Sequence, residues 1–229
     1  MKIRTMIAGM IAMCTSAFAG STAGILDKPT EERMGAPAPA GATVLLGAGC
    51  DLAHWQMENR PEAPITWICD EGVLSIRPKT GNLHTRAVYQ DFQLHLEFNM
   101  VDAPGNSGLY IERRYEVQIF DSLGKPVGRG ECGGIYKQRA PDVNACRALG
   151  AWQSYDIVFR SPRWDGERKV ENARITVVLN GKMLHDDVEI TAKTGAGLPE
   201  GPGGGFLRLQ DHGDVVRFRN GWIKSLELK

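Results

Sequence analysis

The most constraining feature of this chain is the strict alternation of apolar and polar residues in the stretch "DFQLHLEFNM", residues 91–100. The apolar positions are Phe92, Leu94, Leu96, Phe98 and Met100. Successive residues of a β-strand point to opposite faces of a sheet, whereas a helix would repeat its apolar positions every three or four residues. The stretch therefore predicts an antiparallel strand with one face buried in a core and one face toward solvent.

Further short stretches of the same kind follow one another between turns rich in glycine and proline. They occupy residues 72–78, 107–122, 152–160, 173–186 and 203–223. Within 173–186, the dipeptide Asn180-Gly181 is typical of the type I′ turn that joins two hairpin strands. No segment has the periodicity of a long amphipathic helix. The chain predicts an all-β fold, a two-sheet antiparallel jelly-roll sandwich, formed by a single domain over residues 43–229.

The N-terminus has the pattern of an export signal. Lys2 and Arg4 precede an apolar run over residues 6–13, and Ala17-Phe18-Ala19 matches the small-residue motif of a cleavage site. We expect a signal peptide over residues 1–19, too short to span a bilayer, and a flexible leader over residues 20–42. The mature protein is expected in the periplasm or the medium.

Four cysteines remain once Cys14 leaves with the signal peptide. An even number in an oxidising compartment predicts disulfides, and three pairings are possible. The order along the chain favours Cys50–Cys69 and Cys132–Cys146, each closing a local loop. Metal binding is the weaker alternative, because the sequence has no Cys-x-x-Cys pair.

The charge balance gives no sign of a polyanionic partner. The chain has 27 Lys and Arg residues against 27 Asp and Glu residues. A nucleic acid or an anionic membrane would call for a basic surface, so we expect neither as a partner. A small neutral carbohydrate fits this balance. The sequence contains no phosphate loop and no dinucleotide fingerprint, so no organic cofactor is evident.

Two strands carry unusually dense polar faces. In "YEVQIFD" the polar face includes Glu116 and Gln118, and in "LRLQDH" it includes Arg208 and Gln210 and leads to His212. The residues expected to line one concavity are Glu116, Gln118, Arg208, Gln210, His212, Arg217 and Arg219. Such amide and guanidinium groups donate hydrogen bonds in fixed directions, as sugar recognition requires.

A simpler interpretation of the same residues stays open. The polar rows could form a solvated face with surface salt bridges such as Glu116–Arg219. His212 could be a turn residue held in place by Asp211.

The two stretches "GNSGLYIERRYEVQIFDS" and "LRLQDHGDVVRFRNGWIKSLEL" resemble the 3-keto-disaccharide hydrolase domain family. The matching motifs are Asn106-Ser107-Gly108, residues 115–118, residues 209–213 and residues 218–220. The resemblance extends from about residue 44 to the C-terminus. The loop between Gly130 and Trp152, with its two cysteines, departs from the family pattern and leaves the choice of substrate open.

This resemblance implies a concanavalin-like jelly roll with a carbohydrate groove on its concave sheet. It also implies a substrate that a separate glycoside 3-dehydrogenase has oxidised at C3. A ketone at C3 acidifies the C2 hydrogen, so a base can remove that proton and the C1 oxygen can be expelled. The site then needs a base, donors to the enolate oxygen and an acid for the leaving group.

We assign Glu116 and His212 as the catalytic pair, either of which could serve as base or as acid. The expected substrate-binding residues are Asn106, Gln118, Arg208, Gln210, Asp211 and Arg219. A divalent metal ion could polarise the ketone, but the sequence does not identify its ligands.

Two other functions remain in view. A retaining glucanase would need two carboxylates on one strand, and the chain offers only Glu116-x-Gln118-x-x-Asp121. A non-catalytic carbohydrate-binding module is the second alternative, because jelly rolls serve as lectins as readily as enzymes.

Overall fold

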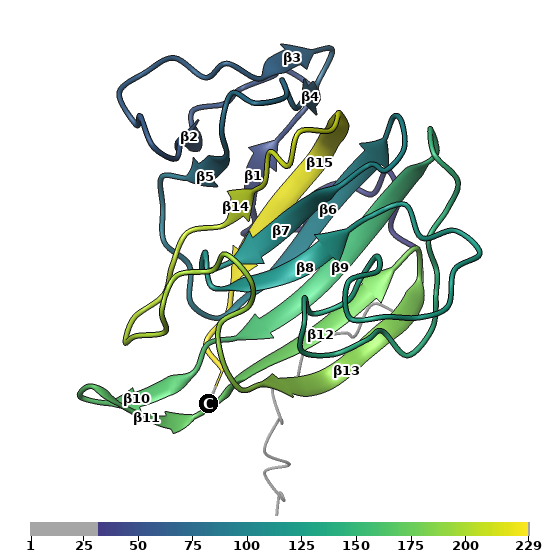
Figure 1. The fold of residues 1–229 in the computed structure, drawn as a ribbon. Helices are drawn as coiled ribbons and strands as arrows, with labels where there is room; N and C mark the ends of the chain where they lie inside the picture. The colour runs from purple at the N-terminus through teal and green to yellow at the C-terminus, as the bar shows by residue number, and fades with distance from the viewer. Residues whose placement is uncertain (1–31, 229) are drawn as a thin grey trace, which may run out of the picture.

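The computed structural model describes residues 32–228, so the expected signal peptide and most of the expected leader lie outside the described residues. Two β-sheets pack face to face, as Figure 1 shows. Every strand pair in the two sheets is antiparallel, and no helix occurs among residues 32–228. The predicted all-β sandwich is confirmed.

The larger sheet has eight strands in the order β13-β12-β9-β6-β15-β4-β3, with β1 paired to β15. Its strands are β1 (Thr43–Leu46), β3 (Ile68–Asp70), β4 (Val73–Ser75), β6 (Phe92–Met100), β9 (Trp152–Arg160), β12 (Ala173–Leu179), β13 (Lys182–Ile190) and β15 (Val216–Ser225). The expected Asn180-Gly181 turn joins β12 to β13, and both of its residues have positive φ.

The smaller sheet has five strands in the order β2-β5-β14-β7-β8. Its strands are β2 (Trp55–Met57), β5 (Leu83–Thr85), β7 (Ser107–Ile111), β8 (Tyr115–Ile119) and β14 (Arg208–Leu209). A separate hairpin, β10 (Arg163–Asp165) and β11 (Arg168–Glu171), extends from one corner. Because β14 lies between β5 and β7, it brings the C-terminal part of the chain beside the first half.

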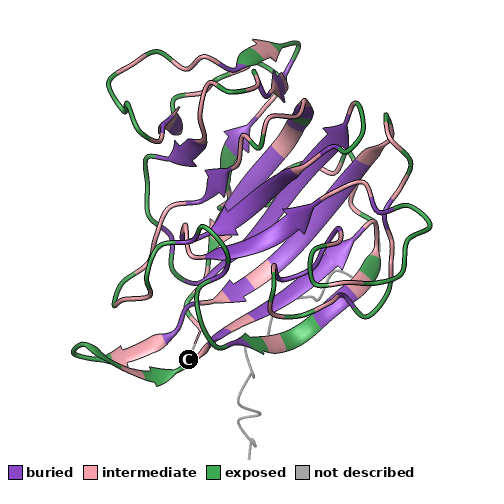
Figure 2. Cartoon of the chain, in the orientation of Figure 1, coloured by how far each residue is buried: buried purple, intermediate pink, exposed green. Residues whose placement is uncertain are grey.

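The core lies between the two sheets, where the alternating apolar rows meet. Most of the residues in the central strands of both sheets are buried (Figure 2). The row of β6 faces inward as predicted, and Phe98 stacks on Tyr155 with ring centroids 4.9 Å apart. Leu209 of β14 and Val117 of β8 bury the opposite side of the core. The polar residues of β14 and β8 consequently lie on the side of the smaller sheet that faces away from the core.

Strand β6 differs from the prediction in one respect, because its polar face is also buried. His95 and Glu97 are both 0% exposed. Part of the cover comes from the described end of the expected leader. The Gly35 amide donates to Glu97 Oε1 over 2.6 Å, and Asn220 Nδ2 donates to the Ala36 carbonyl over 3.0 Å. Residues of this segment thus contact the outer face of the larger sheet.

Of the two expected disulfides, Cys50–Cys69 is confirmed, with a Cα–Cα distance of 5.7 Å. Cys132–Cys146 is wrong, because both residues are buried free thiols. Cys132 Sγ lies 3.4 Å from the Tyr155 hydroxyl, while Cys146 Sγ contacts the Phe120 carbonyl at 3.6 Å. The loop is closed instead by polar contacts, such as the 2.8 Å bond from the Cys132 amide to Ser122 Oγ.

These thiols allow a direct test. The hydrogen bond from Cys132 lowers the pKa of Cys146 to about 7. We expect both cysteines to be alkylated rapidly in denaturant without reductant, and slowly in the folded protein because both are buried. Peptide mass mapping of the alkylated protein provides the measurement. A Cys132–Cys146 cross-linked peptide in the unreduced sample would contradict the structure.

Candidate active site

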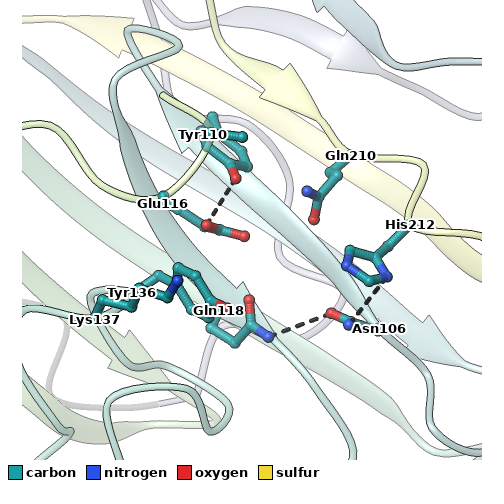
Figure 3. A pocket seen from close by; sticks show the side chains of 10 residues that line it. Asn106, Tyr110, Glu116, Gln118, Tyr136, Lys137, Gln210 and His212 are labelled. Atoms are coloured by element: carbon teal, nitrogen blue, oxygen red, sulfur yellow. Dashed lines mark hydrogen bonds between the residues drawn. The ribbon is translucent and has the colours of Figure 1, made fainter. Parts of the chain in front are cut away.

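A pocket of about 240 Å³ lies where β7, β8 and the segment after β14 meet. Its lining residues are Asn106, Tyr110, Glu116, Gln118, Tyr136, Lys137, Gly195, Ala196, Gln210 and His212 (Figure 3). Two loops build its outer walls along β8. The Tyr136 amide donates to the Glu116 carbonyl over 3.0 Å, and the Thr194 amide donates to the Arg114 carbonyl over 2.8 Å. Four parts of the chain that are distant in sequence therefore form one concavity. They are residues 106–118, 136–137, 195–196 and 210–212.

Glu116 provides the carboxyl group of the pocket. Its residue is 3% exposed, and the Tyr110 hydroxyl donates to its Oε2 over 2.7 Å. Gly108 on the neighbouring strand leaves room for it, because a Cβ there would lie 2.5 Å from Glu116 Oε1. Burial raises the pKa of Glu116, which makes the carboxylate a stronger base than an exposed glutamate.

His212 is the imidazole of the pocket, and it reaches the site from the turn after β14. Its Nδ1 lies 3.2 Å from Asn106 Nδ2, and Gln118 Nε2 donates to Asn106 Oδ1 over 3.3 Å. A positive charge on the His212 ring would lower the pKa of Glu116 and so oppose the effect of burial on that carboxyl. The structure thus brings together the acid and the imidazole that the sequence predicted as a pair.

Two amide side chains of the pocket have spare hydrogen-bonding capacity. Gln118 Oε1 and Gln210 Oε1 are both buried and have no hydrogen-bond partner among the described residues. A buried polar atom without a partner is costly, and such atoms usually mark a place for a ligand or a water molecule. These two oxygens can accept hydrogen bonds from hydroxyl groups in the pocket.

Arg208 and Asp211 lie beside the pocket and do not line it. The Arg208 guanidinium sits 3.5 Å from the centroid of the Tyr110 ring and 3.4 Å from Glu58 Oε1, so it supports Tyr110 from behind. The Asp211 carboxylate accepts hydrogen bonds from the amides of Thr80, Gly81 and Gly213. It holds this turn, and it binds these amides rather than the His212 ring.

The expectation that Arg217 and Arg219 join the same concavity is wrong. Both belong to β15 of the larger sheet. Arg219 Nε donates to Glu97 Oε2 over 2.7 Å and its guanidinium covers the Trp152 ring at 3.9 Å, so the alternative Glu116–Arg219 salt bridge is wrong too. Alternation along a strand separates its two faces, but it does not say which sheet the strand enters.

Tyr110, Tyr136 and Lys137 are pocket residues that sequence reasoning missed. Tyr110 carried a usable signal, because it pairs with Glu116 across β7 and β8 and so shares its face. Tyr136 and Lys137 come from an irregular loop, which has no periodicity to follow.

The described residues contain no group of three or more His, Cys, Asp or Glu side chains placed to hold a metal ion. The metal ion stays an untested expectation. Across residues 32–228 there is likewise no helix of the length and apolar character needed to cross a membrane.

Comparison with known proteins identifies the family. A family model described as the 3-keto-alpha-glucoside-1,2-lyase-like domain matches residues 41–224. No curated protein matches the chain. A solved structure from Parabacteroides distasonis ATCC 8503, described as a "putative glycosyl hydrolase", is 33% identical with a TM-score of 0.75, covering 83% of this chain and 86% of that one.

A second protein of that organism with the same description is 26% identical, with a TM-score of 0.57, and covers 80% of this chain and 100% of that one. A third, with a TM-score of 0.65 and coverage of 82% and 94%, is 23% identical and supports the fold alone. The match over residues 41–224 contains every residue that lines the pocket and both sheets except Ser225, the last residue of β15. The chain therefore belongs to the family of 3-keto-alpha-glucoside-1,2-lyase-like domains.

Proposed function

We propose that this protein cleaves 3-keto-glycosides by removing the C2 proton and eliminating the C1 substituent. The observation that carries the proposal is the pocket that holds Glu116, with its raised pKa, together with His212. A proton acceptor and an imidazole in one concavity are what this elimination requires and what a purely binding protein does not need.

The reaction can be written with the residues of the pocket. A base takes the C2 proton, and the electron pair of the broken C–H bond delocalises onto the C3 oxygen as an enolate. When the carbonyl at C3 re-forms, C1 and C2 become double-bonded and the bond from C1 to the aglycone oxygen breaks. An acid protonates that oxygen. The products are an alcohol and an enone, and addition of water to the enone would complete a net hydrolysis.

The remaining polar groups suit the rest of the substrate. Gln118 and Gln210 offer free acceptor oxygens for sugar hydroxyls, and both residues line the same pocket as the catalytic pair, together with Asn106 (Figure 3). Tyr110 holds Glu116 in place through its 2.7 Å hydrogen bond. Lys137 adds a positive charge at the rim that favours an enolate.

The proposal includes a cellular context. The substrate has to be supplied by a dehydrogenase that oxidises the C3 hydroxyl of a glycoside. The Cys50–Cys69 disulfide supports action in the periplasm or outside the cell, because such bonds persist in oxidising compartments.

The test is a panel of 3-keto-glucosides with the unoxidised glucosides as matched controls. We expect absorbance of the enone and release of the aglycone from the keto substrates alone. Parallel reactions after dialysis against a chelator would test whether a divalent metal ion takes part. Binding of the 3-keto sugars without turnover would favour the carbohydrate-binding module instead.

The retaining glucanase has weaker support. Such an enzyme needs a second carboxylate about 5 Å from the first. Among the described residues that line the pocket, Glu116 is the only carboxylate, and Asp121 lies outside the lining. Hydrolysis of an unoxidised β-glucan would reverse this ranking.

A further inference from the structure

A chain of hydrogen bonds runs along one side of the pocket and ends on the imidazole of His212. Gln118 Nε2 donates to Asn106 Oδ1 over 3.3 Å, and Asn106 Nδ2 lies 3.2 Å from His212 Nδ1 (Figure 3). Asn106 itself is anchored, because its backbone amide donates to Asp214 Oδ2 over 2.9 Å. The direction of this chain decides where the imidazole carries its proton.

The nitrogen of a side-chain amide has hydrogens and no acceptor lone pair, so it can only donate. With Asn106 Oδ1 occupied by Gln118, the amide nitrogen of Asn106 faces His212 Nδ1, and Nδ1 must accept. A neutral imidazole has one N–H, which then resides on Nε2. We propose that Asn106 is a positioning residue that fixes neutral His212 as the Nε2–H tautomer.

This inference rests on the proposed function for its catalytic meaning, and it divides the roles within the pair. In Figure 3 the second ring nitrogen of His212 lies on the side of the pocket that Glu116 and Gln210 face. An Nε2–H group donates a hydrogen bond to an oxygen of the substrate. His212 then donates this hydrogen bond to the departing C1 oxygen and stabilises its developing negative charge, while Glu116 takes the proton from C2. Solvent, which reaches the exposed His212, protonates the departing oxygen, and Glu116 returns the C2 proton to solvent after the elimination.

The opposite direction of these hydrogen bonds would give His212 a different catalytic role. Suppose that the side-chain amides of Asn106 and Gln118 were both flipped, with oxygen and nitrogen exchanged. His212 Nδ1–H would then donate to Asn106 Oδ1, and Asn106 Nδ2 would donate to Gln118 Oε1. His212 Nε2 would then present a lone pair to the pocket and act as the base. The two directions therefore predict different tautomers for the same heavy-atom positions.

Nitrogen-15 NMR distinguishes the two tautomers of His212. It is recorded on the protein without substrate, with all five histidines labelled. The His212 signals are identified by their loss in His212→Gln, and the spectra are recorded at about pH 8.5, where an ordinary histidine is neutral. We expect the wild-type His212 to have its hydrogen on Nε2. The variant Asn106→Asp replaces the donor by an acceptor, so we expect its His212 hydrogen to move to Nδ1. Asn106→Leu, with neither group, should give a mixture.

Kinetics add a second readout. We expect Asn106→Asp to lower kcat on a 3-keto-glucoside by about tenfold or more with KM changed less, because the donor to the leaving oxygen is lost. A wild-type Nδ1–H tautomer, or an unchanged tautomer in Asn106→Asp, would overturn the inference. The NMR needs no substrate, so an Nε2–H tautomer without turnover would refute the proposed function alone.

Discussion

Replacing Glu116 by Gln is expected to lower kcat on a 3-keto-glucoside by about 10²–10⁴-fold, because a carboxamide cannot take the C2 proton. The fold should survive, since Gln has the same shape and its oxygen can still accept the 2.7 Å hydrogen bond from Tyr110. The loss should appear in kcat more than in KM. Initial rates of enone formation, with the thermal midpoint recorded for each protein, provide the measurement.

The matched control is Asp121→Asn, the same chemical change at the acidic residue three positions beyond Gln118. Because Asp121 lies outside the pocket lining, we expect wild-type rates from this variant. A retaining glucanase would instead lose activity on both changes. Wild-type turnover by Glu116→Gln would remove the residue from the mechanism.

The sequence predicted the sandwich well because the evidence for it is local. Alternation in residues 91–100 determines which side chains of β6 point inward, and the Asn180-Gly181 dipeptide favours one turn geometry. The same local patterns could not predict that the polar face of β6 is also buried. That burial depends on contacts such as Gly35 with Glu97 and Asn220 with Ala36, which join parts of the chain 62 and 184 residues apart.

The sequence predicted only part of the site, because strand alternation is a local pattern. Glu116, Gln118, Gln210 and His212 were found because strand alternation puts each on a polar face, and β14 lies beside β7 in the smaller sheet. Arg219 also lies on a polar face, but its strand pairs with β6 in the other sheet. Strand partners are set by packing over the whole domain, and no short-range pattern reports them.

Arg208 shows that alternation can predict the direction of a side chain without predicting whether the side chain reaches the pocket. Its side chain does lie on the pocket side of β14, as its position between Leu207 and Leu209 predicted. The Tyr110 ring nevertheless lies 3.5 Å above its guanidinium, and Arg208 is 5% exposed. Alternation gives the direction of a side chain, whereas the neighbour that covers it is known only from the assembled sheet.

Glu97 should make the folded protein sensitive to acid. Burial alone would raise its pKa, but the His95 ring, Asn220 and the Gly35 amide lower the pKa of Glu97 from 4.5 to about 2. The folded protein therefore binds this proton less readily than the unfolded chain does. The resulting stabilisation is fully present above about pH 4.5 and is lost as the pH falls toward 2, by roughly 3 kcal/mol.

Urea unfolding of the wild type and of Glu97→Gln, from pH 7 down to 2, measures this loss. We expect Glu97→Gln to be less stable at pH 7, and we expect the difference between the two proteins to shrink as the pH falls, because a protonated Glu97 resembles Gln. Glu189→Gln is the control, since its side chain is 55% exposed and an exposed ion pair contributes at most about 1 kcal/mol. A difference for Glu97→Gln that stayed constant down to pH 2 would show that its effect comes from shape, and that the carboxylate charge does not hold residues 35 and 36 against the larger sheet.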